Sequence, residues 1–293
     1  MSAIDTPLSL FDVAGKSALI TGASGAFGQV AARVLAGAGC KLTLTAGNAE
    51  ALDEIAARSS LSLVGQRAVH DGRQSVGEIA LDEIAGICRD LGAEVTTVNA
   101  RPGDQAAAEA MVKAAVDAHG ALDILVVASG MNKVARIDEM DPATFAQVMD
   151  ANVTQSWLLA RAATVQMKAQ GGGKIVLVSS ARGLLGHPAG YTAYCASKAA
   201  VDGITKALGC ELGPTGITVN AIAPTVFRSP LTAWMFEDNP EAEKVRAGFL
   251  TRVPKGRLGE PEDLAGPLLF LASKASDFYT GHILYADGGY TAG

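Results

Sequence analysis

The sequence lacks most features that mark metal-binding, secreted and membrane proteins. Its four cysteines are scattered without metal-ligand spacing, so we expect reduced thiols in a cytoplasmic protein and no metal site. No uncharged apolar run reaches the roughly 18 residues that a membrane-spanning helix needs. The N-terminus has no basic segment followed by an apolar one, so no signal peptide is expected.

An excess of basic residues is also missing. Lysine and arginine total 24 against 30 aspartates and glutamates, which gives a formal net charge of -6. This balance argues against nucleic acid as the main partner, although ordinary solubility explains the sign fully. The 293 residues suffice for one large α/β domain with a substantial core. We therefore expect neither nucleic acid nor a membrane as a partner.

Apolar, strand-like runs alternate with helical segments along the chain. The expected strands lie near 17–21, 41–45, 94–99, 122–128, 174–179, 217–223 and 282–286. Alternation of this kind predicts a parallel sheet with helices on both faces. No linker divides the chain, so we predict one domain over residues 1–293.

A serine, a tyrosine and a lysine are placed so that one site can use all three. Tyr194 and Lys198 are four residues apart and lie on one face of a helix expected to continue over about 196–207. A neighbouring ammonium lowers the pKa of a phenol, which is otherwise about 10. Ser180 ends the apolar run that begins at Ile175, so its hydroxyl can hold a substrate oxygen while Tyr194 moves the proton. The combination suits interconversion of an alcohol and a carbonyl, although Tyr-x-x-x-Lys alone often marks a solvated helix face.

A glycine-rich turn separates the first expected strand from the first expected helix. Gly22, Gly25 and Gly28 follow the strand that ends at Thr21, and an alanine-rich helix is expected over about 29–36. Glycines in this place let the backbone approach a pyrophosphate, whose charge the helix N-terminus favours. A tight turn without a ligand is the alternative, and the position between strand and helix argues against it.

Together these motifs resemble the short-chain dehydrogenase/reductase family in its single-domain branch, from about residue 11 to 289 apart from one insertion. The matching positions are Thr21, Gly22, Ala26, Gly28, Asn152, Ser180, Tyr194, Lys198, Pro224, Thr225, Asp287, Gly288 and Gly289. The resemblance implies a doubly wound, seven-stranded Rossmann fold, a nicotinamide dinucleotide and a homo-oligomer, either dimer or tetramer. It adds Asn152 to the catalytic set as the anchor of a proton-relaying water, and it implies that Lys198 holds the nicotinamide ribose.

The departures from the family pattern cluster where the cofactor would bind. Ala26 replaces the middle glycine, Arg101 stands where the family has an adenine-contacting aspartate, and Thr225 replaces a glycine. The Asn-Asn-Ala-Gly motif of the family reads Val-Ala-Ser-Gly at 127–130. A guanidinium can stack on a purine, so Arg101 can contact adenine by another mode. The predicted cofactor-binding residues are Gly22, Ser24, Gly25, Phe27, Gly28, Ala46, Gly47, Asn48, Arg101, Ser129, Gly130, Tyr194, Lys198, Pro224 and Val226.

The end of the second expected strand does not decide between NAD and NADP. Residues 46–48 read Ala-Gly-Asn, so the acidic residue that would bind a ribose diol and repel a 2′-phosphate is absent. An arginine at position 47, which would favour the 2′-phosphate, is absent too. The missing carboxylate favours NADP and leaves NAD open.

A repeated hexamer marks a predicted insertion. Ala-Leu-Asp-Glu-Ile-Ala occurs at 51–56 and again at 80–85, and removal of 57–85 would join helix and strand smoothly. The segment would lie beside the adenosine end of the cofactor, where its three arginines could reach a 2′-phosphate. A surface excursion or an oligomer contact is the favoured alternative, because loops usually run over the surface.

The substrate pocket is expected between the loop after Ser180 and a lid at about 225–260. The candidate substrate contacts are Arg182, His187, Tyr191 and Trp234. Arg182 could hold a carboxylate, as a sugar acid would offer, or could be a solvated loop residue. Trp234 could equally be an oligomer contact.

The leading hypothesis is an NAD(P)-dependent oxidoreductase that interconverts a secondary alcohol, such as a polyol or sugar acid, and a ketone. A sugar-nucleotide epimerase or dehydratase is one alternative, because Gly22, Gly25 and Gly28 also fit the extended branch of the family. Only about 70 residues follow Ala223, too few for the substrate domain of that branch. A cofactor-sensing or scaffold protein on the same fold is the other alternative.

Overall fold

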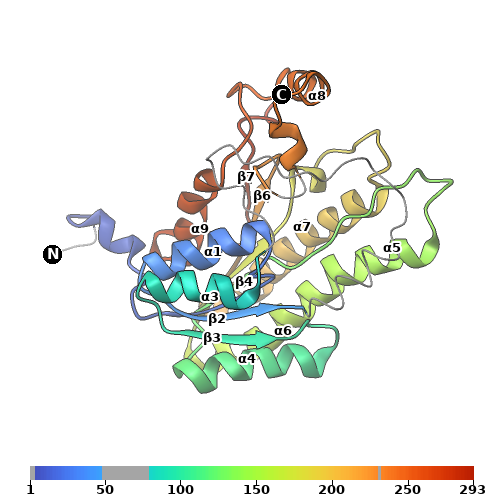
Figure 1. The fold of residues 1–293 in the computed structure, drawn as a ribbon. Helices are drawn as coiled ribbons and strands as arrows, with labels where there is room; N and C mark the ends of the chain where they lie inside the picture. Colours follow the sequence, from blue (N-terminus) through green and yellow to red (C-terminus); the bar gives the residue numbers. More distant parts are fainter. Residues whose placement is uncertain (1–3, 48–78, 230–231) are drawn as a thin grey trace.

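The computed structural model describes residues 4–47, 79–229 and 232–293. Seven parallel strands form one sheet in the order β3-β2-β1-β4-β5-β6-β7 (Figure 1). The strands are β1 (Ser17–Thr21), β2 (Lys41–Ala46), β3 (Val95–Asn99), β4 (Ile124–Val127), β5 (Gly173–Val178), β6 (Ile217–Pro224) and β7 (Ile283–Ala286). All seven lie where the sequence predicts them, which confirms the predicted Rossmann-type sheet.

Helices cover both faces of the sheet. The helices on one face are α1 (Ala26–Gly37), α3 (Leu81–Asp90) and α9 (Ala265–Ala272), and those on the other are α4 (Gln105–His119), α6 (Gln155–Gln170) and α7 (Thr192–Leu212). Alternate strand residues point to opposite faces, so Ala18 and Ile20 join the first apolar cluster while Leu19 joins the second. These strand residues are fully buried, and this two-sided burial explains the continuous apolar runs in the sequence.

Two further helices lie near the carboxyl edge of the sheet, α5 (Pro142–Met149) and α8 (Pro240–Leu250). A π-helix of five residues, Asp150–Thr154, joins α5 to α6. A 3-10 turn, Ala181–Gly183, follows β5. No helix of the described residues is long and apolar enough to cross a membrane.

The strand order reverses between β1 and β4, so the chain leaves these two strands toward opposite sides. A crevice at the carboxyl ends of the strands opens at such a switch point and is the usual ligand site of this fold. The two loops meet closely here, because a Cβ added at Gly22 would lie 2.7 Å from the backbone of Ser129. The hydroxyls of Thr21 and Ser129 are 3.0 Å apart and tie the loops together.

The predicted insertion falls largely outside the described residues, and so do its three arginines and Asn48. The second copy of the repeated hexamer is described, and it forms the start of α3, with Ile84 and Ala85 buried against α1. Because the two copies are identical, removal of 51–79 leaves the same sequence as removal of 57–85. The insertion stays a prediction, and the helix it interrupts begins at the second copy.

Candidate active site

Tyr194 and Ser180 meet above the carboxyl end of β5. Helix α7 begins at Thr192, earlier than predicted, so Tyr194 occupies its first turn. Ser180 lies two residues beyond β5 and caps the 3-10 turn, where its hydroxyl accepts a hydrogen bond from Arg182 N at 3.1 Å and donates to Pro224 O at 3.4 Å. The Ser180 hydroxyl also lies close enough to the Tyr194 phenol to lower its pKa.

Burial controls the acidity of Tyr194 more than any charge does. Removal from water raises the pKa of the Tyr194 phenol, while the nearby Ser180 hydroxyl and the charge of Arg182 lower it by less. The sequence-based expectation attributed an acidic phenol to Lys198 alone. In the structure Lys198 is not among the groups that lower this pKa, and its Nζ lies 5.6 Å from the centre of the Tyr194 ring.

Lys198 is buried at 6% exposure, and its ammonium donates to Val178 O at 2.8 Å. The pKa of Lys198 is lowered to about 8, because the effect of burial outweighs the opposite effect of the negative charge of Asp202. Asp202 is buried one turn further along α7 and accepts a hydrogen bond from Ser179 at 2.5 Å. Sequence reasoning missed Asp202, although its four-residue spacing from Lys198 is the signal that could have found it.

Asn152 lies at the centre of the π-helix and joins the loop after β4 to α7. Its side-chain oxygen accepts from Met131 N at 2.7 Å, and its amide nitrogen donates to Met131 O at 2.9 Å and to Ser197 Oγ at 2.8 Å. Single π turns often occur at functional sites, and this one turns the Asn152 side chain into the site. Neither Met131 nor Ser197 was predicted, because these contacts depend on the tertiary fold.

The glycine turn after β1 forms a tight cradle. Gly22 has φ +64°, and a Cβ added at Gly28 would lie 2.0 Å from Gly22 O. Gly25 is the N-cap of α1. Ala26 begins that helix, and none of the described non-glycine residues has a positive φ. The methyl group of Ala26 therefore fits, because Gly22 is the left-handed residue of this turn and Gly28 is its most crowded glycine.

Arg101 lies across the end of β2. A Cβ added at Gly47 would come within 2.1 Å of Arg101 Nε and 2.9 Å of its Cγ and Cδ. Ala46, the last residue of β2, is buried and offers no carboxylate. Residues 46 and 47 carry no charged side chain, and the Arg101 guanidinium lies beside them at the end of β2.

The remaining predicted cofactor residues line the same edge. Ser24 and Phe27 lie in the turn and first helix after β1, where the Ser24 carbonyl accepts a hydrogen bond from Gln29 and Phe27 packs on the α1 side of the core. Ser129 and Gly130 follow β4, Pro224 ends β6, and Val226 follows it. A Cβ added at Gly130 would lie 2.8 Å from Asn152 Oδ1, so a side chain there would displace the Asn152 side chain. The residues present fit a dinucleotide, because the crowded glycines leave their backbone open to a pyrophosphate.

Three of the four candidate substrate contacts come together. The His187 and Tyr191 ring centres are 4.5 Å apart, and Tyr191 meets Tyr194 edge to face at 6.3 Å. Arg182 follows Ser180 by two residues and influences the pKa of Tyr194. Trp234 is 46% exposed, and no ring contact or side-chain hydrogen bond of the described residues joins it to the other three.

The comparisons with known proteins agree with this geometry. A family profile described as enoyl-(acyl carrier protein) reductase matches residues 74–291. An uncharacterized oxidoreductase of Mycobacterium tuberculosis is 47% identical over 286 residues, which cover 97% of this chain and 94% of that protein. The chain belongs to the short-chain dehydrogenase/reductase family. As a member of that family it is an NAD(P)-dependent oxidoreductase.

Solved structures of family members share the whole fold. The short-chain type dehydrogenase/reductase of Mycobacterium marinum superposes with a TM-score of 0.79 at 30% identity, covering 100% of each chain. A gluconate 5-dehydrogenase of Burkholderia cenocepacia J2315, in complex with NADP and tartrate, gives a TM-score of 0.79 at 28% identity and covers 98% of this chain and 99% of that one.

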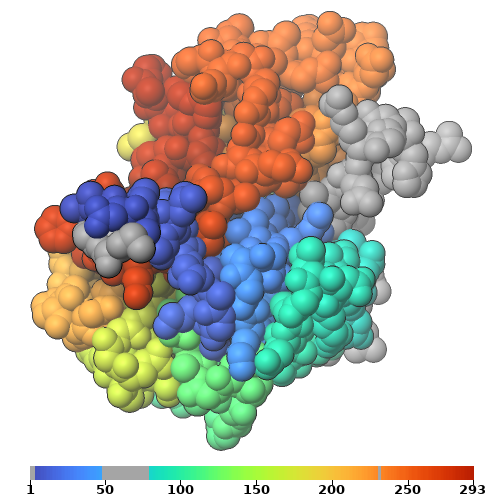
Figure 2. All heavy atoms as spheres, turned by 90° about the vertical axis from the view of Figure 1, so that its left-hand side faces the viewer, coloured from blue at the N-terminus to red at the C-terminus, as the bar shows by residue number. Residues whose placement is uncertain are grey.

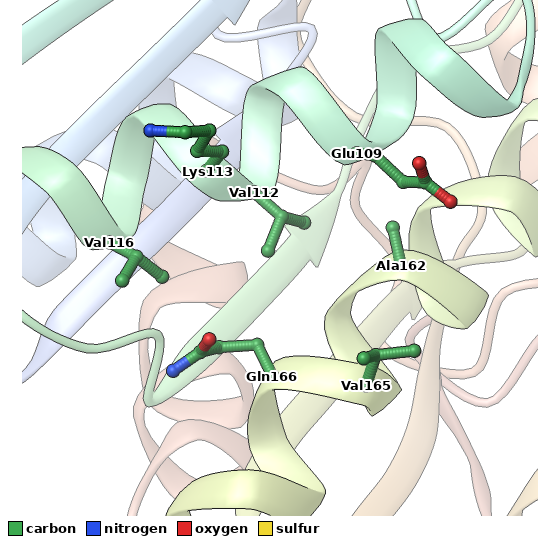
Figure 3. Close-up of a pocket in the computed structure, with 7 residues that line it drawn as sticks. All are labelled: Glu109, Val112, Lys113, Val116, Ala162, Val165 and Gln166. Atoms are coloured by element: carbon green, nitrogen blue, oxygen red, sulfur yellow. The ribbon is translucent and has the colours of Figure 1, made fainter.

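A hollow elsewhere on this dehydrogenase/reductase is separate from the predicted site. It lies between α4 and α6, and Figure 3 shows residues of both helices around it. The lining residues are Glu109, Val112, Lys113, Val116, Ala162, Val165 and Gln166. None of them was predicted for catalysis, cofactor or substrate, so we assign the chemistry to the edge of the sheet instead.

Asp202 is expected to set the pH range in which the enzyme works. In Asp202→Asn the negative charge that raises the pKa of Lys198 is lost, so this pKa falls below about 8. A larger fraction of Lys198 is then neutral at pH 8, and the alkaline limb of kcat/KM for ketone reduction moves to lower pH. The check is a pH–rate profile beside Asp277→Asn, which changes an exposed carboxylate paired with Lys174. Superposable profiles of Asp202→Asn and the wild type would contradict this role.

Proposed function

We propose that this enzyme interconverts a secondary alcohol and a ketone by hydride transfer, with Tyr194 as the acid–base group. The observation that carries the proposal is the meeting of three groups beside the glycine cradle. The Ser180 hydroxyl lies close enough to the Tyr194 phenol to lower its pKa, and the buried Lys198 ammonium lies 5.6 Å from the centre of the same ring. This arrangement serves a reaction in which an oxygen gains or loses a proton as its carbon gains or loses a hydride.

Four side chains of the site have separate roles in this reaction. Ser180 holds the substrate oxygen, and Tyr194 donates a proton to it during reduction. The raised pKa of Tyr194 keeps the phenol protonated near neutral pH, which suits the reductive direction. A bound nicotinamide supplies or accepts the hydride. Lys198 places positive charge beside the phenol and reaches the nicotinamide ribose, while Asn152 fixes the loop after β4 and anchors the relay water.

Polyols and sugar acids are the substrates we propose. The related Burkholderia enzyme is a gluconate 5-dehydrogenase, and Arg182 stands two residues from Ser180 to meet an acid group. The test is a fluorescence titration with NADPH and NADH, followed by a screen of secondary alcohols and sugar acids. If the protein bound neither NADPH nor NADH, the proposal would be refuted and a scaffold role favoured.

We further propose NADP as the preferred cofactor, with Arg101 at its 2′-phosphate. The guanidinium crosses Gly47 at the end of β2, where no carboxylate opposes a phosphate. The bound NADP of the Burkholderia relative supports this choice. The lid at 225–260, the single domain, the homo-oligomer and a cytoplasmic location stay predictions.

Replacement of Arg101 separates its two possible roles. In Arg101→Ala we expect the Kd for NADPH to rise about tenfold or more, because a charge-assisted contact is lost, while the Kd for NADH is unchanged. Arg89→Ala, an arginine of α3 that bonds Val95 O, is the control. Equal weakening of both dinucleotides would instead indicate stacking of Arg101 on the adenine.

A further inference from the structure

Two arginines lie over one buried tyrosine beside the catalytic groups. The guanidinium of Arg182 is 5.4 Å from the centre of the Tyr290 ring, and Arg182 Nη2 donates to the Tyr290 hydroxyl at 3.0 Å. The guanidinium of Arg252 is 4.5 Å from the centre of the same ring. Phe249 stacks on Tyr290 at 5.1 Å, and Tyr290 itself is 2% exposed. The ring is thus a fixed platform for two cations.

The fold brings these groups together from distant parts of the chain. Asp287 accepts hydrogen bonds from the backbone of Gly289 and Thr291, at 2.9 Å each, and so shapes the turn that carries Tyr290. This turn packs on the loop after α8, because a Cβ added at Gly289 would lie 2.9 Å from Pro254. Figure 1 shows α8 beside the C-terminus, and Figure 2 shows the orange residues of this region as the upper part of the molecule.

Neither guanidinium has a carboxylate partner among the residues that the structure describes. By contrast, two neighbouring arginines of the same region are paired, Arg228 with Glu260 and Arg257 with Asp263. The charges of Arg182 and Arg252 also reach His187, a candidate substrate contact. Burial and the charges of both arginines lower the pKa of His187.

Two guanidinium groups that lack a carboxylate partner among the described residues and lie against one buried ring are suited to bind an anion. Arginine is suited to this task, because its planar guanidinium meets a carboxylate with two parallel hydrogen bonds. The backbone N–H of Arg182 also bonds the Ser180 hydroxyl, so the Arg182 side chain starts beside the group proposed to hold the substrate oxygen. We propose that Arg182 and Arg252 together bind a carboxylate of the substrate, which makes the enzyme selective for hydroxy acids over neutral polyols. This inference rests on the proposed function.

The test compares tartrate with threitol, which has the same four-carbon skeleton and central hydroxyls but carries uncharged primary alcohols in place of the two carboxylates. Both are titrated calorimetrically into the enzyme saturated with NADPH. We expect tartrate to bind at least tenfold more tightly than threitol. Arg182→Ala and Arg252→Ala should each raise the Kd for tartrate by about tenfold or more and leave the Kd for threitol unchanged. The Kd of Arg252→Lys for tartrate should lie between those of the wild type and Arg252→Ala, because lysine keeps the positive charge but cannot make two parallel hydrogen bonds to a carboxylate.

Controls keep the proposal separate from the proposed function. Arg33→Ala, which removes an exposed arginine of α1, should leave the Kd values for tartrate and threitol unchanged. Normal NADPH binding with no preference for tartrate, or with a preference that both arginine variants retain, overturns the anion site and leaves the oxidoreductase intact. Loss of NADPH binding by the unaltered protein refutes the proposed function itself. A thermal melt of each variant shows whether Tyr290 still packs.

Discussion

Replacement of Tyr194 by phenylalanine should lower kcat by about 10²–10⁴-fold, the usual contribution of a positioned acid–base group. The change removes one oxygen atom and keeps the ring, which packs edge to face on Tyr191 at 6.3 Å. The lost hydroxyl is the one whose pKa the neighbouring Ser180 lowers. With it gone, no group at this position can give a proton to the substrate oxygen. The measurement is single-turnover oxidation of NADPH with the best ketone from the screen.

Cofactor affinity separates a chemical defect from a structural one. The Kd for NADPH should stay within about twofold of the wild type in Tyr194→Phe, because the glycine cradle and Arg101 are untouched. Tyr279→Phe is the control, since it removes a hydroxyl from a partly exposed ring that packs on Phe270 outside the predicted site, and its kcat should remain near the wild-type value. Turnover by Tyr194→Phe at a rate close to that of the wild type would mean that another group carries the proton.

The sequence alone predicts the sheet and the reacting groups because both depend on short-range patterns. The seven apolar runs mark buried parallel strands, and the spacing of Tyr194 and Lys198 fixes them on one helix face. The turn at Gly22 and Gly28 is equally local. Each of these features is complete within about one strand, turn or helix.

The environment of the reacting groups is set by long-range packing and could not be predicted in the same way. Arg252 and Tyr290 reach Arg182 only because the C-terminal turn packs on the loop after α8. The π-helix at Asn152 has no sequence signature that ordinary periodicity detects. The raised pKa of Tyr194 comes from burial, which depends on every segment that covers it. Local spacing therefore predicts which groups react, and tertiary packing decides their acidity and the substrate they meet.

Replacement of Gly28 by alanine should abolish tight cofactor binding, with a rise of about 100-fold or more in the Kd for NADPH. The added Cβ would lie 2.0 Å from Gly22 O and 2.7 Å from Ala23 Cα, and backbone atoms cannot turn aside as a flexible side chain can. The turn must open, at a cost of about 1–3 kcal/mol in unfolding free energy. Its amides then no longer converge on a pyrophosphate.

The same helix offers a matched control for this prediction. Gly37 ends α1, and a Cβ added there meets nothing within 4 Å. Gly37→Ala should bind NADPH as the wild type does and should melt slightly higher, because alanine is favoured over glycine in a helix by about 0.5–1 kcal/mol. Both variants add one methyl group to α1, so a difference between them isolates the approach of Gly28 to Gly22. Wild-type NADPH affinity in a folded Gly28→Ala would show that the cradle does not hold the pyrophosphate, and the cofactor site would then have to be sought elsewhere on the sheet edge.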